Sequence, residues 1–170
     1  MACEVPVEDH TELERRVLEA VTATGEPYEL IEIDPELAET ATFCEQYGYP
    51  LATSGNCILV ASKDDPPVLA AGVALATTKL DVNKRLRKLL GVRKLSFAPP
   101  ELTRERTGME VGGVTPFALP ADLPVYLDAR IADLDRVVVG GGGRRFKLSV
   151  PPSALTAVGG EYVEELALPL

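Results

Sequence analysis

The chain has 170 residues, of which 46% are hydrophobic and 25% charged, which is the balance of an ordinary globular protein. No apolar run approaches the roughly 20 residues that a membrane helix needs, and the first residues lack the basic start and apolar core of a signal peptide. Three cysteines at unrelated spacings fit reduced thiols better than a disulfide framework. These features predict a cytoplasmic protein without a membrane partner.

The charge is strongly uneven along the chain. A net charge of −9 argues against nonspecific binding of nucleic acid, so DNA is not an expected partner. The window 79–94 nevertheless carries +6, which leaves −15 for the rest of the chain. Its candidate phosphate-binding residues are Lys79, Lys84, Arg85 and Lys88. The alternative is a solvated helix face that binds nothing.

Apolar periodicity and turn residues predict the elements of the first half. Apolar residues on one face predict a helix over Glu8–Thr22, and Asp34-Pro35 predicts the start of a second one. The second helix is expected to run to about Gln46 and to stop near Gly48. The expected strands are Tyr28–Ile33, Cys57–Ser62 and Val68–Ala76.

In the second half, Asp81 is expected to cap a basic helix over Val82–Leu90, which ends at Gly91 and turns Leu86, Leu89 and Leu90 to the core. Pro99-Pro100 predicts the start of another helix, which runs to about Arg106. Pro151-Pro152-Ser153 predicts a last helical turn. The expected strands are Val125–Leu127, Arg136–Val139 and Phe146–Val150. This irregular mixture favours an α/β class: a single compact mixed domain with a curved, largely antiparallel sheet flanked by helices.

Several chemistries are disfavoured by the residue inventory. His10 is the only histidine and lies in a polar segment where exposure is expected, so neither a Ser-His-Asp arrangement nor a zinc site is predicted. No metal and no organic cofactor are expected. The run Gly140–Gly143 matches neither a dinucleotide fingerprint nor a P-loop. Gly141 and Gly142 can expose N–H groups to a substrate, or they can form the tip of a hairpin; both readings stay open.

The stretch Gly108–Pro116, GMEVGGVTP, is the most informative part of the chain. Its glycines permit close approach of a ligand or positive φ, and its proline fixes the exit from the turn. CILVA at Cys57–Ala61 and the segment Ala74–Lys94 precede it, and VVVGGGGRRFKLSVPPSAL at Val137–Leu155 follows it. In this order the segments resemble the YbaK / prolyl-tRNA-synthetase-associated editing domain family, from roughly Tyr28 to Gly160.

The resemblance implies a YbaK-like domain over residues 28–170 that hydrolyses the ester of mischarged tRNA, with an N-terminal helical segment, residues 1–27, outside the resemblance. It also implies that Gly112 and Pro116 lie at the terminal adenosine of the substrate. Ester hydrolysis needs a pocket, a positioned water and donors for the carbonyl oxygen, and Gly112-Gly113 offers two backbone N–H groups in succession. Thr115 can contact a polar group of the substrate or stabilise the turn.

One position departs from the family pattern. Well-known members have an active-site lysine where this chain has Asn56, at the start of a strand. Asparagine keeps two N–H donors and one acceptor but supplies no charge. The electrostatic contribution of the lysine is therefore absent unless Lys79 or another cation reaches in. We hypothesise that Asn56 positions water or substrate, with an altered amino-acid specificity. Alternatively, Asn56 only shapes a turn and the protein binds without hydrolysing. Cys57 beside it is expected to be a small core residue and not a nucleophile.

The sequence thus predicts a trans-editing hydrolase that deacylates mischarged tRNA and binds the acceptor end along its basic segment. Two other classes of protein compete with it. One is a non-catalytic module that binds an aminoacyl or nucleotide ligand, and the other is a protein-interaction domain that uses its basic helix.

Overall fold

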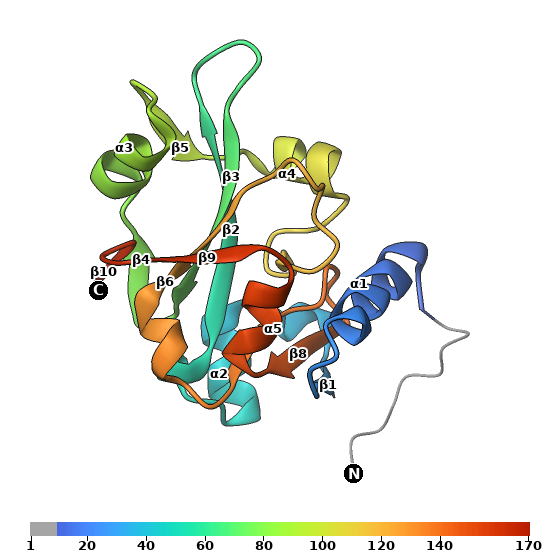
Figure 1. Cartoon of the computed structure of the whole chain (residues 1–170). Helices are drawn as coiled ribbons and strands as arrows, with labels where there is room; N and C mark the ends of the chain where they lie inside the picture. The colour runs from blue at the N-terminus through green and yellow to red at the C-terminus, as the bar shows by residue number, and fades with distance from the viewer. Residues whose placement is uncertain (1–9) are drawn as a thin grey trace.

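The computed structural model of the protein describes residues 10–170 (Figure 1). Its helical elements are α1 (Glu12–Ala23), η2 (Pro35–Leu37), α2 (Thr40–Tyr47), η3 (Leu51–Thr53), η4 (Val82–Leu86), α3 (Arg87–Leu90), α4 (Pro100–Thr107), η5 (Ala129–Asp133) and α5 (Pro152–Ala157). Its strands are β1 (Glu29–Glu32), β2 (Gly55–Ser62), β3 (Leu69–Leu75), β4 (Thr78–Leu80), β5 (Leu95–Phe97), β6 (Val125–Asp128), β7 (Val137–Gly140), β8 (Phe146–Val150), β9 (Gly160–Val163) and β10 (Ala167–Pro169). No helix within residues 10–170 is long and apolar enough to cross a membrane.

Strands β2 and β3 form a long antiparallel hairpin in the middle of the fold, as Figure 1 shows. It lies inside a five-stranded sheet of order β5-β2-β3-β6-β9. A second sheet has the order β1-β8-β7, and β10 pairs with β4 in a third. Only the β3–β6 and β6–β9 pairings are parallel among these named strands. The mixed α/β class with mainly antiparallel pairing is therefore confirmed, with the strands distributed over three sheets instead of one.

The largest hydrophobic cluster joins the five-stranded and three-stranded sheets. Leu59 of β2, Leu127 of β6 and Leu148 of β8 are fully or almost fully buried in it. Helix α1 adds Val17 and Val21, both completely buried. Because apolar burial is the main driving force of folding, this shared cluster holds the two sheets in a fixed relation. The functional site described below depends on that relation.

Strand β8 presents different residues to its two sides, as expected for the alternation of a strand. Phe146, Leu148 and Val150 belong to the main cluster. Lys147 lies between them in sequence and contacts the ring of Phe43, on α2. Strand β7 pairs with β8 so that Gly140 lies opposite Lys147, and residues 141–145 connect the two strands. Of the two alternatives considered for the glycine run, the hairpin is confirmed.

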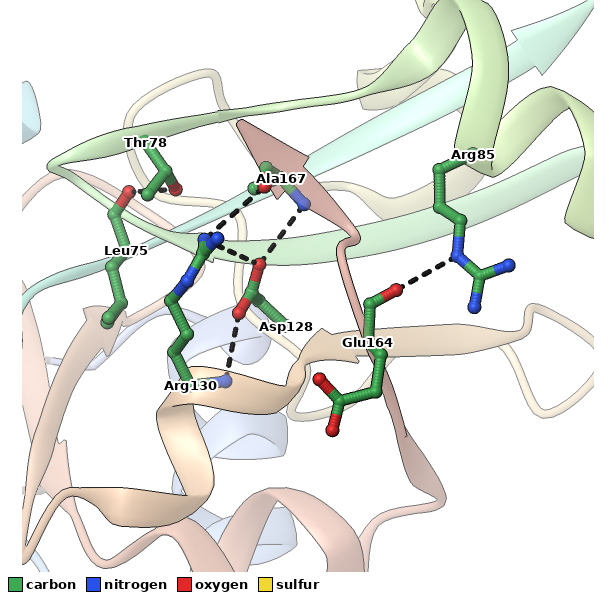
Figure 2. A network of polar contacts seen from close by, with 7 residues as sticks. All are labelled: Leu75, Thr78, Arg85, Asp128, Arg130, Glu164 and Ala167. Carbon is green, nitrogen blue, oxygen red and sulfur yellow. Dashed lines mark hydrogen bonds and ion pairs between the residues drawn. The ribbon is translucent and has the colours of Figure 1, made fainter. Parts of the chain in front are cut away.

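A buried carboxylate fixes the C-terminal strand (Figure 2). Asp128, at the end of β6, is 1% exposed and accepts hydrogen bonds from the backbone N–H groups of Arg130 (2.9 Å) and Ala167 (3.1 Å). The Arg130 guanidinium bridges the same carboxylate and the Ala167 carbonyl, both at 3.3 Å. In the same view, Arg85 Nε donates to the Glu164 carbonyl at 2.9 Å, which ties the basic helix to the segment that leads into β10.

Several predicted helix boundaries are confirmed. Gly48 and Gly91 both adopt the left-handed conformation and end α2 and α3. The Asp81 side chain accepts from the backbone N–H of Lys84, as expected of a cap. The N-terminal helix covers Glu12–Ala23 and is capped by Thr11, whose backbone is extended, so the predicted inclusion of His10 and Thr11 in the helix is wrong. Residues 8 and 9 of the predicted helix lie outside the described residues.

Two helices differ from the prediction. The helix expected from Asp34 is divided into η2 and α2, with extended backbone at Glu39 between them. The basic helix opens with π-helical geometry in η4, and its Leu89 is 37% exposed instead of buried. Its buried side chains in η4 are Val82 and Leu86. Periodicity alone assigned Leu89 to the core because it ignores this local change in helical pitch.

Candidate active site

A cavity of about 490 Å³ lies where β2, α2, β5, α4 and the β7–β8 hairpin meet the glycine segment. Its polar lining includes Thr40, Asn56 and Lys147, and its rim includes the exposed side chains of Phe97 and Val111. A second cavity of similar volume lies near Pro116 and Leu119 and contains only one ionisable side chain, that of Asp122, among its lining residues. Because specific binding needs a few convergent polar groups in an apolar pocket, the first cavity is the better candidate for chemistry.

Asn56 lies at the second position of β2, opposite Ala74 of β3, and its side chain lines the cavity. The hydroxyl of Thr40, the first residue of α2, donates to Asn56 Oδ1. This bond occupies the acceptor side of the amide. Within residues 10–170 no hydrogen bond is formed by Asn56 Nδ2, so both of its N–H donors are available to a ligand. Nothing in the sequence indicated that Thr40 would orient Asn56.

Gly112 also lines the cavity, and its conformation explains the glycine. Its φ is +89°, and a Cβ at this position would lie 2.9 Å from the Arg144 guanidinium. Arg144 fixes the loop from the outside by donating to the carbonyl groups of Val111 and Pro35, each at 2.9 Å. The Gly112 carbonyl accepts from Lys147 Nζ at 3.3 Å. Gly112 and Asn56, separated by 56 positions in sequence, therefore belong to one site.

Gly113 has a packing role. Its N–H donates to the Glu110 carbonyl at 2.8 Å, and its own carbonyl accepts from the Gly142 N–H. A Cβ on Gly113 would lie 2.0 Å from the Gly143 carbonyl oxygen, so the loop and the β7–β8 turn touch backbone to backbone. This corrects the expectation that Gly112 and Gly113 offer two free N–H donors in succession. Of these two residues, Gly112 alone has an N–H without a backbone partner within residues 10–170.

Four of the predicted site residues do not line the central cavity: Gly141, Gly142, Thr115 and Pro116. A Cβ on Gly141 would clash with the Phe146 ring at 2.5 Å, and Gly142 has φ +96° against α1. Thr115 is completely buried, and its hydroxyl has no hydrogen-bond partner within residues 10–170. Pro116 lines the second cavity. Of the glycine run, Gly140 is the residue that lines the central cavity, instead of the expected Gly141 and Gly142.

The basic residues lie outside this cavity. Lys79, Lys84 and Lys88 are exposed, and Arg85 is held by the Glu164 carbonyl. None of these four residues lines the central cavity. Element η4 does contact β5, whose Phe97 lies on the cavity rim. Lys79 therefore does not reach into the cavity beside Asn56.

Lys147 is the functional candidate that sequence reasoning missed. It is 4% exposed and lines the same cavity as Asn56 and Gly112. Its Nζ lies 5.2 Å from the centroid of the Phe43 ring. Burial lowers the pKa of Lys147 to about 8, because desolvation disfavours the charged form. A lysine in the middle of the apolar strand Phe146–Val150 was the available signal.

Two further side chains limit the chemistry. Cys57 lines the cavity, but burial raises the pKa of its thiol to about 12, so it is not a thiolate nucleophile near neutral pH. His10 is 6% exposed, with its ring 5.8 Å from the Phe146 ring, which corrects the expectation that it is exposed. It does not line the central cavity. In the described part of the chain, no three His, Cys, Asp or Glu side chains are grouped as metal ligands.

Comparison with known proteins identifies the family. The profile of the aminoacyl-tRNA editing domain matches residues 34–158, so the chain belongs to this family. The uncharacterized protein YwhH of Bacillus subtilis (strain 168) is 29% identical over 128 residues, which cover 75% of this chain and 79% of YwhH.

Two solved structures share the fold. A proposed trans-editing enzyme for prolyl-tRNA synthetase has a TM-score of 0.77 at 23% identity, over 92% of this chain and 98% of that one. The hypothetical protein APE2540 has a TM-score of 0.79 at 24% identity, over 90% of this chain and 99% of that one. At these identities the likeness establishes the fold, and it agrees with the resemblance that the sequence motifs indicated.

Proposed function

We propose that this protein is an aminoacyl-tRNA deacylase that acts in trans and hydrolyses the ester between a wrongly attached amino acid and the terminal adenosine. The observation that carries the proposal is the convergence of the Asn56 amide and the Gly112 backbone on one cavity in a member of the editing-domain family. The ester would lie between these two groups.

The available donors suit the hydrolysis of an activated ester. An aminoacyl ester needs a positioned water and donors for the carbonyl oxygen, and it needs neither a covalent intermediate nor a metal. Asn56 Nδ2 can hold the water or the substrate amino group, because Thr40 occupies the Oδ1 side. Gly112 lines the same cavity, and its N–H, which has no backbone partner among residues 10–170, would be the backbone donor. Thr115 and Pro116 would act indirectly, by shaping the loop that carries Gly112.

The acceptor end of the tRNA would lie along the exposed basic segment. Lys79, Lys84 and Lys88 are exposed cations within ten residues of a chain whose net charge is −9. The contact between η4 and β5 leads from this segment to Phe97 on the cavity rim. Contacts to phosphates predict an affinity for tRNA that falls steeply with salt, whereas a surface for an acidic protein would leave tRNA unbound.

The test is release of amino acid from a panel of correctly and incorrectly charged tRNAs. Asn56→Asp is the sharpest variant, because it keeps the acceptor for Thr40 and removes both N–H donors. We expect selective deacylation by the wild type and a loss of about 10- to 100-fold in Asn56→Asp and Asn56→Ala. Lys63→Met, at an exposed lysine of the β2–β3 loop, is the control for a remote substitution.

The results separate the functional classes. Equal rates in the wild type and both Asn56 variants would contradict the role of Asn56. Binding of charged tRNA by folded wild-type protein without any release would contradict hydrolysis and identify a binding module. If the folded protein neither binds charged tRNA nor releases amino acid, the remaining function is a protein interaction through the basic helix.

A further inference from the structure

In the candidate site lies a buried ammonium group that has no carboxylate partner among residues 10–170. Lys147 is 4% exposed, and the ion pairs among residues 10–170 are Arg130–Asp128 and Arg145–Glu14. Its own contacts are the Gly112 carbonyl at 3.3 Å and the face of the Phe43 ring. Both partners are neutral. Within the described part of the chain, the charge is therefore compensated by the dipole of a carbonyl group and by the quadrupole of a ring.

Such an arrangement is unfavourable for stability alone. Burial of an unpaired ammonium costs several kcal/mol, and an apolar side chain of the same length would fill the space without that cost. An ammonium has three N–H donors, and the Gly112 carbonyl takes one of them. Since Lys147 lines the cavity, the remaining donors can reach a ligand there.

The groups around Lys147 leave it mostly charged near neutral pH. Cys44 on α2 and Arg144 in the β7–β8 connection act on it electrostatically, the thiol raising its pKa and the guanidinium lowering it. Glu39 and Cys57 line the same cavity, and Glu39 is exposed. Desolvation is the largest influence and brings the pKa to about 8. At pH 7 about nine tenths of the side chains then carry the positive charge.

We propose that the Lys147 ammonium binds the acyl carbonyl oxygen of the substrate and stabilises the negative charge that this oxygen acquires during hydrolysis. Lys147 is thus a catalytic residue of the site, and it supplies from β8 the cation that Asn56 cannot supply from β2. This inference rests on the proposed deacylase function.

The step uses only water and the ester. The water oxygen forms a bond to the acyl carbon, and the carbonyl electron pair moves to the oxygen that Lys147 binds. When the carbonyl reforms, the bond between the acyl carbon and the ribose oxygen breaks. The ribose oxygen takes the proton that the water loses, and the free amino acid carboxyl group ionises to solvent. Lys147 remains protonated throughout and donates hydrogen bonds only.

The kinetic test compares Lys147→Met, Lys147→Arg and the control Lys63→Met on the substrate panel between pH 6 and pH 9.5. We expect Lys147→Met to lose about 100-fold in kcat/KM at pH 7, as is typical when a donor to an oxyanion is removed. Lys147→Arg keeps the charge and should retain more activity than Lys147→Met. The ratio of wild type to Lys147→Met should fall by up to tenfold per pH unit above about pH 8, where Lys147 loses its proton.

A double variant tests the exchange of position directly. Asn56→Lys combined with Lys147→Met returns a cation to the cavity from β2, and we expect it to recover activity relative to Lys147→Met alone. Lys147→Met that is as active as Lys63→Met, or a ratio that is independent of pH, would overturn the proposal for Lys147 while leaving the deacylase function intact.

A binding measurement separates the two proposals if the wild type releases no amino acid. The probes are 3′-deoxy-3′-aminoadenosine acylated with alanine, serine or proline, whose amide bond resists hydrolysis. We expect the NMR signal of Lys147 Cε to shift on addition of a probe and the Lys147 pKa to rise, because the carbonyl oxygen favours the charged form. Absence of any shift at Lys147 with all three probes would overturn the contact, whatever the hydrolytic activity is.

Discussion

Replacement of Lys147 by methionine should stabilise the protein while it removes activity. Methionine has nearly the same length and flexibility as the lysine stem, so it fills the space beside Phe43 without a charge. The wild type holds a 4% exposed ammonium that has no carboxylate partner among the described residues. The gain in the free energy of unfolding should therefore depend on the charge of Lys147, and hence on pH.

The magnitude follows from linkage between proton binding and folding. The pKa of Lys147 falls from 10.5 to about 8 on folding, which corresponds to about 3 kcal/mol against the charged folded form. Between these two values the unfolded chain binds more protons than the folded one, so stability rises with pH. The penalty is fully present below about pH 8 and disappears as the pH approaches 10.5. From pH 7 to pH 9.5 the wild type should gain about 2 kcal/mol relative to Lys147→Met.

The assay is urea unfolding of both proteins at pH 7 and at pH 9.5, with the difference between them as the measured quantity. Other titrating groups, including Tyr126 and Tyr162, whose pKa values are raised by burial, are common to both proteins and cancel in this difference. Lys63→Met should show no such pH dependence, because Lys63 is exposed. A stability difference for Lys147→Met that is the same at both pH values would refute the reasoning that Lys147 is a desolvated cation.

Two further predictions concern the frame of the site. Gly113→Ala should cost about 3 kcal/mol, because its Cβ would lie 2.0 Å from the Gly143 carbonyl oxygen, whereas Gly143→Ala meets no atom within 4 Å and should be nearly neutral in the same urea assay. Asp128→Ala should lower the free energy of unfolding by about 3 kcal/mol, because it leaves the buried N–H of Ala167 unpaired, and Asp128→Asn should cost less since its amide oxygen can still accept. Equal costs for the members of either pair would contradict these assignments.

The sequence alone determined the features that depend on neighbours along the chain. Gly48 and Gly91 mark helix ends because the left-handed conformation is strained for other residues. Strand β8 has the predicted bounds Phe146–Val150, and Asp81 caps the basic helix as expected. The motif order around Gly108–Pro116 indicated the family that the profile over residues 34–158 confirms.

Other elements were beyond local reasoning. Strands β5, β9 and β10 have only three or four residues each, and the sequence did not predict them. They form because neighbouring strands offer hydrogen bonds, as β6 does for β9. Their apolar residues give too short a pattern for a period of two to be recognised. The π-helical opening of the basic helix and the exposure of Leu89 were likewise not predicted. In this region η4 contacts β5, and Arg85 donates to the Glu164 carbonyl, and both partners are distant in sequence.

The composition of the site was decided by tertiary structure. From the sequence, Asn56 and Gly112 were candidates, whereas Thr40 and Lys147 were not, although all four line one cavity. The sequence can assign a lysine to a strand, but the face on which its ammonium meets other groups depends on how separate sheets pack. Here the β7–β8 hairpin, closed against the loop at Gly113, brings Lys147 to the Gly112 carbonyl. The positive charge that Asn56 lacks is thus supplied to the same cavity by Lys147, on a strand about 90 residues further along the chain.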